Sequence, residues 1–396
     1  MKLPEPESFP KMRISTALLL ALVTIAAVAP LNAAQAPIPS PPTVPTTGYI
    51  LIDHDSGRVL AAQRSDDRME PASITKLMTA YIVFDALRGK RLSLTDSVKV
   101  SEYAWRTGGA VTDGSTSFLE LGSEVPVEDL IKGMIVQSGN DATIALGEKV
   151  GGSESGFVQM MNTYGQRLGL KGTHFANSWG GPAADHYSTA RDIATLSSAL
   201  IRNFPDYYKY YSMREFTWNK HTQQNRNGLL ARDPSVDGIK TGHTESAKYC
   251  LVTSAKRNGM RLISVVLGSP TIKAREDASA ALLSYGFTFY ETVPLQQAGK
   301  ALLQPHVFKG ATETVGVGSL RDISVTLPRG QSATLSKEAT INGPLVAPLA
   351  AHSPVGEYKV MVGKDVVARI PLVTLTAVED GGWWHSMVDT VKLWFE

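Results

Sequence analysis

The sequence has almost no cysteine, and its positive and negative residues nearly balance. Cys250 is the single cysteine among 396 residues, so no disulfide can form within the chain, and packing must stabilise the fold. A catalytic thiol is one alternative, but a lone cysteine is more often a small buried side chain, and we assign Cys250 no role. Lys plus Arg total 39 and Asp plus Glu 37, a balance that gives no electrostatic footprint for nucleic acid. We expect no nucleic-acid partner.

Long apolar runs are confined to the N-terminus. Lys11 and Arg13 precede an apolar run over residues 14–29, and Ala34-Gln35-Ala36 offers a small-residue cleavage site. Residues 1–36 are therefore predicted to be a signal peptide, and the rest of the chain to be exported. An uncleaved membrane anchor is the alternative, although the run is shorter than the about 20 residues that span a bilayer.

The opposite end of the chain has an amphipathic pattern. On a helical wheel for residues 383–396, three tryptophans and four other apolar side chains fall within an arc of roughly 140°, while most polar side chains face away and Leu393 breaks the pattern. We predict an amphipathic, membrane-anchoring helix over residues 378–396 that lies on the inner-membrane surface through residues 383–396. A helix packed against its own protein is the alternative.

Between these ends the sequence predicts two folded domains. Residues 37–47 read as a Pro-rich linker, residues 48–297 as a mixed domain and residues 298–377 as a small all-β domain. Within the linker, residues 37–45 are expected to be extended and not to pack. In the all-β domain, Gly363-Lys364-Asp365 turns one alternating segment into the next, and Pro371 marks an edge strand or a strand end.

The mixed domain has strand signals at both ends and helical signals between them. The strand segments are 49–52 with 58–61, then 236–242, 249–254 and 262–267, the last two joined by the hairpin turn Asn258-Gly259. Helices are expected from Pro71 to Gly89, over 126–136 and 141–150, and over 274–290. This order predicts an α+β fold, one antiparallel sheet covered by helices.

Three short motifs lie far apart in this domain. They are Ser73-Ile74-Thr75-Lys76 at a helix start, Ser138-Gly139-Asn140 between two helices, and Lys240-Thr241-Gly242 in a strand. Each alone is weak, since a helix start, a turn and a solvated strand end would explain them. Together they combine a hydroxyl, amines and an amide in one plausible cleft between helices and a sheet edge.

Ser73 and Lys76 share one face of a helix that is apolar all round, so Lys76 is expected in a desolvated place. At the free lysine pKa near 10.4, only about one amine in 2,500 is neutral at pH 7. Burial and a second cation, Lys240, favour the neutral amine, which can take the proton of Ser73. We therefore expect Ser73 to attack a peptide carbonyl and form an acyl-enzyme, with its backbone N–H as one oxyanion donor.

The three motifs, in this order and in these contexts, resemble those of the penicillin-recognising serine enzymes. The match is closer to the low-molecular-mass D-alanyl-D-alanine carboxypeptidases, on Pro71 to Lys76, Gln137 to Ala142 and Asp237 to Thr244. It extends from about Tyr49 to Glu291, and the all-β domain and amphipathic end also match that family's layout. Residues 48–297 are accordingly expected to form a serine D,D-carboxypeptidase domain.

The resemblance implies further site residues. The N–H of His243, after Gly242, would be the second oxyanion donor, and Arg275 would clamp a substrate carboxylate. Without the resemblance, Arg275 reads as a surface arginine paired with Glu276, and His243 as a strand-end histidine. Ser138 is suited to relay a proton to the leaving amine, Asn140 to hold Lys76 and a substrate amide, and Lys240 and Thr241 to face the same cleft.

Two segments depart from the family's pattern. Residues 244–248 carry more charge than expected, and Trp179 places a bulky side chain in the loop before Asp185. These departures bear on substrate preference rather than on the type of reaction.

The family implies a serine-type carboxypeptidase that removes the terminal D-alanine of peptidoglycan pentapeptides in the periplasm, on the outer face of the inner membrane. It also implies that β-lactams acylate Ser73. A muropeptide endopeptidase and a non-catalytic wall-binding scaffold are alternatives, and the chain can be a monomer or a homodimer. A β-lactamase is disfavoured, because no convincing glutamate to activate water lies around residues 177–185.

We expect no metal and no cofactor at this site. Protein groups supply the nucleophile, base and oxyanion donors, and the eight histidines lack metal-ligand spacing such as H-E-x-x-H.

Overall fold

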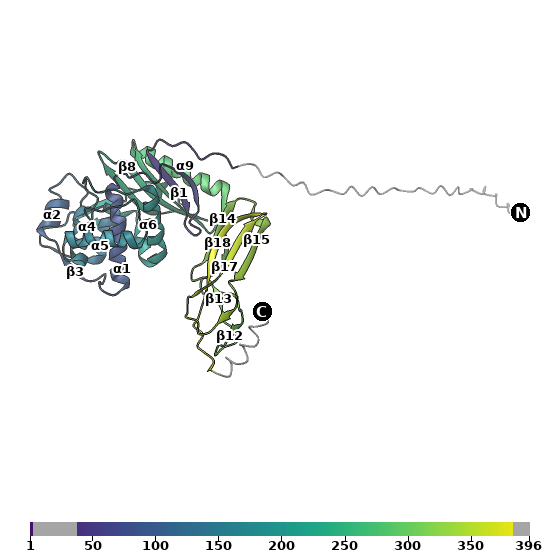
Figure 1. Ribbon diagram of the computed structural model, residues 1–396. Coiled ribbons are helices and arrows are strands. Elements are labelled where there is room, and N and C mark those ends of the chain that lie inside the picture. The colour runs from purple at the N-terminus through teal and green to yellow at the C-terminus, as the bar shows by residue number, and fades with distance from the viewer. Residues whose placement is uncertain (3–37, 383–396) are drawn as a thin grey trace. The chain divides into compact units, whose positions relative to one another are not determined.

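The computed structural model describes residues 1–2 and 38–382 of the chain (Figure 1). The predicted signal peptide and the helix predicted over residues 383–396 lie outside the described residues. Within the described part, no helix is long and apolar enough to cross a membrane.

The mixed domain is built on one antiparallel sheet of five strands (Figure 1). The N-terminal hairpin joins the sheet because β1 pairs with β9 along its whole length, so the two ends of the domain meet in the sheet as predicted. In spatial order the strands are β2 (Val59–Gln63), β1 (Gly48–Asp53), β9 (Met260–Ser269), β8 (Lys248–Arg257) and β7 (Val236–Thr244).

Helices follow the chain between β2 and β7, and one more follows β9. They are η1 (Ala72–Thr75), α1 (Lys76–Arg88), α2 (Glu102–Gly108), α3 (Val127–Lys132), the π turn η2 (Gly133–Gln137), α4 (Asn140–Gly151), α5 (Glu154–Arg167), α6 (Ala190–Asn203), α7 (Pro205–Tyr208), η3 (Lys209–Ser212), α8 (Leu229–Arg232) and α9 (Ile272–Phe289).

The two faces of the sheet pack against different helices. Successive side chains of a strand point to opposite faces, and in β1 and β9 the residues Ile50 and Ile263 join the large core of the helical body. Leu51 and Leu262 instead face α9, where any side chain at Gly286 would collide with both. The helices therefore sandwich the sheet, which confirms the predicted α+β fold.

Helix α1 runs through the centre of the helical body. All its residues from Lys76 to Leu87 are buried except Asp85, as expected for a helix that is apolar all round. Pro71 caps the preceding η1 turn and Gly89 ends α1, as predicted. This packing fixes the turn that carries Ser73.

Two parts of the helical region differ from the sequence prediction. The helix expected over 126–136 divides into α3 and the π turn η2. Two small hairpins also interrupt the helices, because β3 (Ser97–Lys99) pairs with β4 (Glu124–Pro126) and β5 (Glu215–Trp218) with β6 (His221–Gln224). β5 is only four residues long, with Phe216 and Trp218 alternating with polar residues, and its partner β6 is wholly polar, so the pattern is too short to have indicated a hairpin.

The linker also packs more closely than expected. Val44 is buried, and the N–H of Thr47 donates to the carbonyl of Leu267 in β9 at 3.0 Å. The prediction that residues up to Pro45 do not pack is therefore wrong for the end of the linker. The linker packs there because β9 presents backbone polar groups beyond the start of β1, and the chain before Gly48 hydrogen-bonds to them.

The C-terminal region is all β, as predicted. Its main sheet has the order β11-β13-β18-β17-β15, and β10 pairs with β14 and β12 with β16. The strands are β10 (Tyr290–Gln296), β11 (Ala301–Leu303), β12 (Val307–Phe308), β13 (Val317–Gly318), β14 (Ile323–Pro328), β15 (Leu335–Ile341), β16 (Leu345–Val346), β17 (Pro354–Val362) and β18 (Asp365–Thr374), with the short turn η4 (Ser332–Thr334).

Two details of this region refine the prediction. Strand β18 lies between β13 and β17 and is not an edge strand. However, β13 pairs only with the last two residues of β18, Val373 and Thr374, so the missing N–H of Pro371 interrupts no hydrogen-bond ladder on that side. Val378 and Asp380, which the sequence assigned to the terminal helix, bridge to Leu349 and Gly310 instead.

Candidate active site

Ser73 and Lys76 lie at the junction of η1 and α1. The Ser73 hydroxyl is 2.9 Å from the Lys76 Nζ, and Lys76 is 1% exposed. Ser73 therefore lies in the turn that begins the helix, and the buried amine of Lys76, one turn further along, lies next to its hydroxyl. The expected pairing of these two residues is present in the structure.

The Lys76 amine has three neighbours within hydrogen-bond distance. Besides Ser73, it contacts the Asn140 Oδ1 at 2.8 Å and the backbone carbonyl of Trp179 at 2.6 Å. Both of these oxygens can only accept, so a neutral amine must direct its two N–H groups at them. Its lone pair is then left for the Ser73 hydroxyl.

The surroundings of Lys76 favour the neutral amine. Burial holds its pKa well below the ordinary lysine value, and the positive charge of Arg226 lowers that pKa further, while Asp141 acts in the opposite direction. Desolvation is the largest cause. The burial predicted from the apolar helix pattern is therefore present, but the cation that lowers this pKa is Arg226 and not the expected Lys240.

The second motif lies on a sharp connection. Ser138 ends η2 with φ 60°, in the left-handed region, and Asn140 begins α4. The neighbouring Asp141 is buried and accepts from the Thr116 hydroxyl and from the N–H groups of Ser117, Leu119 and Ala142. These bonds hold the segment before β4 against α4 and fix the direction of the Asn140 side chain.

The third motif brings a second buried lysine to the same place. The Lys240 Nζ donates to the Ser138 hydroxyl at 2.8 Å and to the Thr241 carbonyl at 3.2 Å, and its side chain is buried. Burial, followed by the charges of Lys76 and Arg226, lowers the pKa of Lys240. Gly242 lets β7 approach η1, since a Cβ there would lie 2.9 Å from the Pro71 carbonyl.

A cleft of about 700 Å³ opens over these motifs. Lys76 and Lys240 lie beneath it and reach it through Ser73 and Ser138. His243 is exposed, with its ring 4.3 Å from that of Tyr249. The predicted residues that line the cleft are Ser73, Ser138, Asn140, Thr241, Gly242, His243 and Arg275.

Arg275 is a buried residue of the cleft and not a surface arginine. It is 4% exposed, and its Nη1 lies 3.4 Å from the carbonyls of Gly242 and Cys250. Glu276 instead pairs with Arg232 at 3.1 Å, so the alternative of an Arg275–Glu276 surface pair is wrong. Burial lowers the pKa of Arg275, which remains a cation. Cys250 itself is buried, and burial raises its thiol pKa to about 11, as suits an inert thiol.

Several cleft residues were not found from the sequence. Arg226 lines the cleft and donates to the Ser115 hydroxyl at 2.7 Å. The carbonyl of Trp179 reaches Lys76 because Gly180 adopts φ 90°, and a Cβ at Gly180 would lie 1.9 Å from the Ala72 carbonyl. A backbone carbonyl leaves no signature in a sequence, and Arg226 stands in a polar segment without a motif.

Comparisons with known proteins agree with this geometry. A family model described as D-alanyl-D-alanine carboxypeptidase matches residues 35–271, and one described as the penicillin-binding protein 5 C-terminal domain matches residues 290–380.

Individual relatives extend over most of the chain. The D-alanyl-D-alanine carboxypeptidase DacA of Escherichia coli K12 is 41% identical over 97% of this chain and 96% of its own length, and DacC of the same organism is 42% identical over 89% of each. The crystal structure of penicillin-binding protein 5 from Haemophilus influenzae matches with a TM-score of 0.79 and 41% identity, over 86% of this chain and all of that one. The chain therefore belongs to the D-alanyl-D-alanine carboxypeptidase family.

Proposed function

We propose that this carboxypeptidase works through an acyl-enzyme on Ser73, with Lys76 as the general base. The observation that carries the proposal is the position of the Lys76 Nζ, 2.9 Å from the Ser73 Oγ and hydrogen-bonded to two acceptors that occupy its N–H groups. The remaining lone pair is where the hydroxyl proton would go.

Acylation then takes two proton transfers. Lys76 accepts the proton of Ser73 as the Oγ attacks the carbonyl of the penultimate D-alanine, and the oxyanion forms near the N–H groups of Ser73 and His243. As the tetrahedral species collapses, Ser138 passes its proton to the leaving D-alanine nitrogen and takes up the proton that Lys76 received from Ser73, so both groups return to their starting states. Lys240, which donates to the Ser138 hydroxyl at 2.8 Å, holds that hydroxyl in place. Water later hydrolyses the ester and restores Ser73.

The cations of the cleft suit a substrate that ends in a free carboxylate. Lys240 and Arg275 are both buried, and no salt bridge joins either of them to an acid in the part of the chain that the structure describes. Thr241 lines the same wall and can donate its hydroxyl. A terminal carboxylate would neutralise these charges, which explains why the enzyme would act at the end of a chain.

Glu154, an acid that contacts the Trp179 loop at Ser178, is already engaged. Glu154 accepts from the N–H of Ser178 at 2.7 Å and from its hydroxyl at 2.9 Å, and it is not among the residues that line the cleft. This contact supports a carboxypeptidase that β-lactams inhibit over a β-lactamase that destroys them.

The location of the enzyme is also a proposal. The N-terminal signal pattern and the amphipathic pattern of residues 383–396 support export to the periplasm and attachment to the outer face of the inner membrane. Removal of residues 383–396 should move the protein from the membrane fraction to the soluble periplasmic fraction. Retention of the shortened protein on membranes would contradict the anchoring role.

The nucleophile is tested by intact-protein mass spectrometry after exposure to benzylpenicillin. The full chain should gain the mass of one penicillin, the Ser73→Ala variant should gain none, and the exposed Ser93→Ala variant should behave as the full chain does. An adduct on Ser73→Ala would show that another residue is the nucleophile. Release of D-alanine from a pentapeptide, compared with cleavage of a cross-linked dimer, separates the carboxypeptidase from an endopeptidase.

A further inference from the structure

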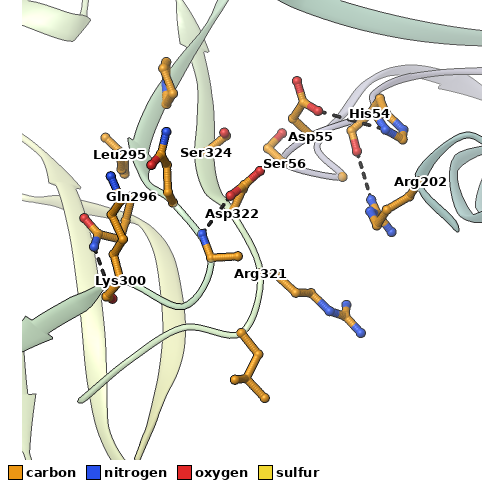
Figure 2. A pocket seen from close by; sticks show the side chains of 15 residues that line it. His54, Asp55, Ser56, Arg202, Leu295, Gln296, Lys300, Arg321, Asp322 and Ser324 are labelled. Carbon is orange, nitrogen blue, oxygen red and sulfur yellow. Dashed lines mark hydrogen bonds and ion pairs between the residues drawn. The ribbon is translucent and has the colours of Figure 1, made fainter. Parts of the chain in front are cut away.

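A second pocket, of about 1050 Å³, lies apart from the catalytic cleft and shares no lining residue with it (Figure 2). One wall consists of the turn between β1 and β2 and the end of α6, which carries Arg202. The other wall consists of the turn between β10 and β11, with Lys300, and the segment before β14, with Arg321. The pocket is therefore formed where the mixed domain meets the all-β domain.

Among the described residues, the cations of this pocket form no direct salt bridge. No salt bridge joins Arg202, Lys300 or Arg321 to a carboxylate within residues 38–382. Arg202 donates only to the His54 carbonyl and the Ser198 hydroxyl, both at 3.2 Å. Burial, and then the positive charge of Arg321, lowers the pKa of Arg202, while the charge of Asp55 acts in the opposite direction.

The pocket's three cations, Arg202, Lys300 and Arg321, outnumber its two acids, Asp55 and Asp322. Asp322 accepts from the N–H of Ala298 at 2.8 Å, which fixes the turn after β10. Asp55 lies 4.0 Å from the Nε2 of His54, whose own pKa falls to about 4, first through burial and then through the charge of Arg202. His54 is therefore neutral at pH 7 and adds no further charge, so the pocket keeps one more cation than it has acids.

Figure 2 shows Arg202 and Lys300 on opposite sides of the pocket, with the side chain of Arg321 extending toward the side of Arg202. A single small anion could not meet cations on both walls of a space this large. A ligand with two separated carboxylates could, and guanidinium groups bind carboxylates through paired hydrogen bonds.

The remaining lining suits a peptide. Gln296 and Gln297 offer amide groups that match a peptide backbone, and Leu295 and Leu320 offer apolar surface for side chains. The family's own reaction makes such a molecule, because loss of one D-alanine leaves a shorter peptide with a new terminal carboxylate. We propose that this pocket binds an acidic peptide with two separated carboxylates, of the kind that the catalytic cleft releases.

The test uses the full chain, acylated with benzylpenicillin so that the catalytic cleft is filled. The probe is the N-dansylated tetrapeptide L-Ala-γ-D-Glu-L-Lys-D-Ala, which carries two carboxylates, and fluorescence anisotropy reports its binding. Saturable binding is expected, and it should weaken by at least about tenfold when both Arg202→Gln and Arg321→Gln are introduced, since hydrogen bonds to charged groups are of this strength. Arg106→Gln, an exposed arginine outside both pockets, is the matched control and should change nothing.

A second probe, the same peptide with its C-terminus amidated, should also bind about tenfold more weakly, because one carboxylate is gone. Absence of saturable binding, equal binding by the double variant, or displacement by sulfate at the peptide's own concentration would each overturn the proposal. Unchanged melting temperature and unchanged acylation would show that the double variant is folded. If penicillin fails to acylate the chain, the proposed role of Ser73 falls, while the comparison of the arginine variants with unacylated protein still decides this proposal.

Discussion

Replacement of Lys76 by methionine separates the catalytic role of its amine from its role in packing. Methionine has a similar length, so the buried space beside α1 stays filled, but no group remains to accept the proton of Ser73. A positioned general base contributes about 10²-fold to 10⁴-fold to rate, so acylation by penicillin should slow by that factor. Stopped-flow or quenched-flow mass spectrometry of the adduct measures this rate.

The same substitution should leave the protein about as stable as before. It removes a buried amine that must be kept neutral, which favours the variant, but it also deprives Asn140 Oδ1 and the Trp179 carbonyl of their donor. Each unpaired acceptor costs about 1–3 kcal/mol, and the two effects oppose each other. Thermal unfolding of Lys76→Met should therefore show a native-like transition, with Lys132→Met, outside the cleft, as the matched control.

The pH dependence of acylation gives the sharper measurement. Because the folded protein lowers the pKa of Lys76, the neutral amine is present at lower pH than in a free lysine, and acylation should fall as pH drops through that lowered pKa. The folded state also binds fewer protons than the unfolded chain there, so this group makes the protein more stable as pH rises toward the ordinary lysine value. If Lys76→Met keeps the wild-type rate and the same acid limb, Lys76 is not the base.

The other predictions concern the geometry around the cleft. Arg275→Gln should raise the KM for a pentapeptide by about tenfold to a hundredfold, with little effect on a peptide amide, as steady-state assays of both substrates would reveal. Gly180→Ala should lower the free energy of unfolding by about 2 kcal/mol or more and should slow acylation. Gly152 also has a positive φ but has open space around it, so Gly152→Ala should lower the free energy of unfolding by about 1 kcal/mol and leave acylation unchanged. Equal acylation rates in the two variants would contradict this reasoning. Asp141→Asn should shift the acid limb of acylation to lower pH, because the charge of Asp141 raises the pKa of Lys76, and an unmoved limb would show that this carboxylate has no influence there.

Periodic apolar patterns account for the parts of the fold that were predicted well. The sheet strands, the α1 helix and the hairpin of β17 and β18 all bury a face or a whole element, and burial requires apolar residues at fixed spacing. The β5 and β6 hairpin has such a face only in Phe216 and Trp218 of β5, since β6 is polar, and its turn at Asn219-Lys220, where both residues adopt positive φ, is the other local signal. The π turn η2 was missed for a related reason, since one extra residue in a helical turn leaves the apolar pattern nearly unchanged.

The site was predictable to the extent that its chemistry resides in side chains. Ser73, Lys76 and Lys240 stand in recognisable motifs, and burial of α1 could be inferred from its composition. The direction of the Lys76 lone pair could not, because it depends on the carbonyl of Trp179, a group that every residue possesses.

That carbonyl gives the loop of Trp179 a function different from the one its side chain suggests. The sequence drew attention to a bulky indole, which bears on substrate preference, whereas the structure shows the backbone carbonyl of the same residue accepting from the Lys76 amine. Gly180 makes this possible, since only a residue without a Cβ can take φ 90° so close to the Ala72 carbonyl. Variation at position 179 is therefore compatible with catalysis as long as position 180 stays glycine. Substrate preference can change in this loop while the Lys76 amine keeps its orientation toward Ser73.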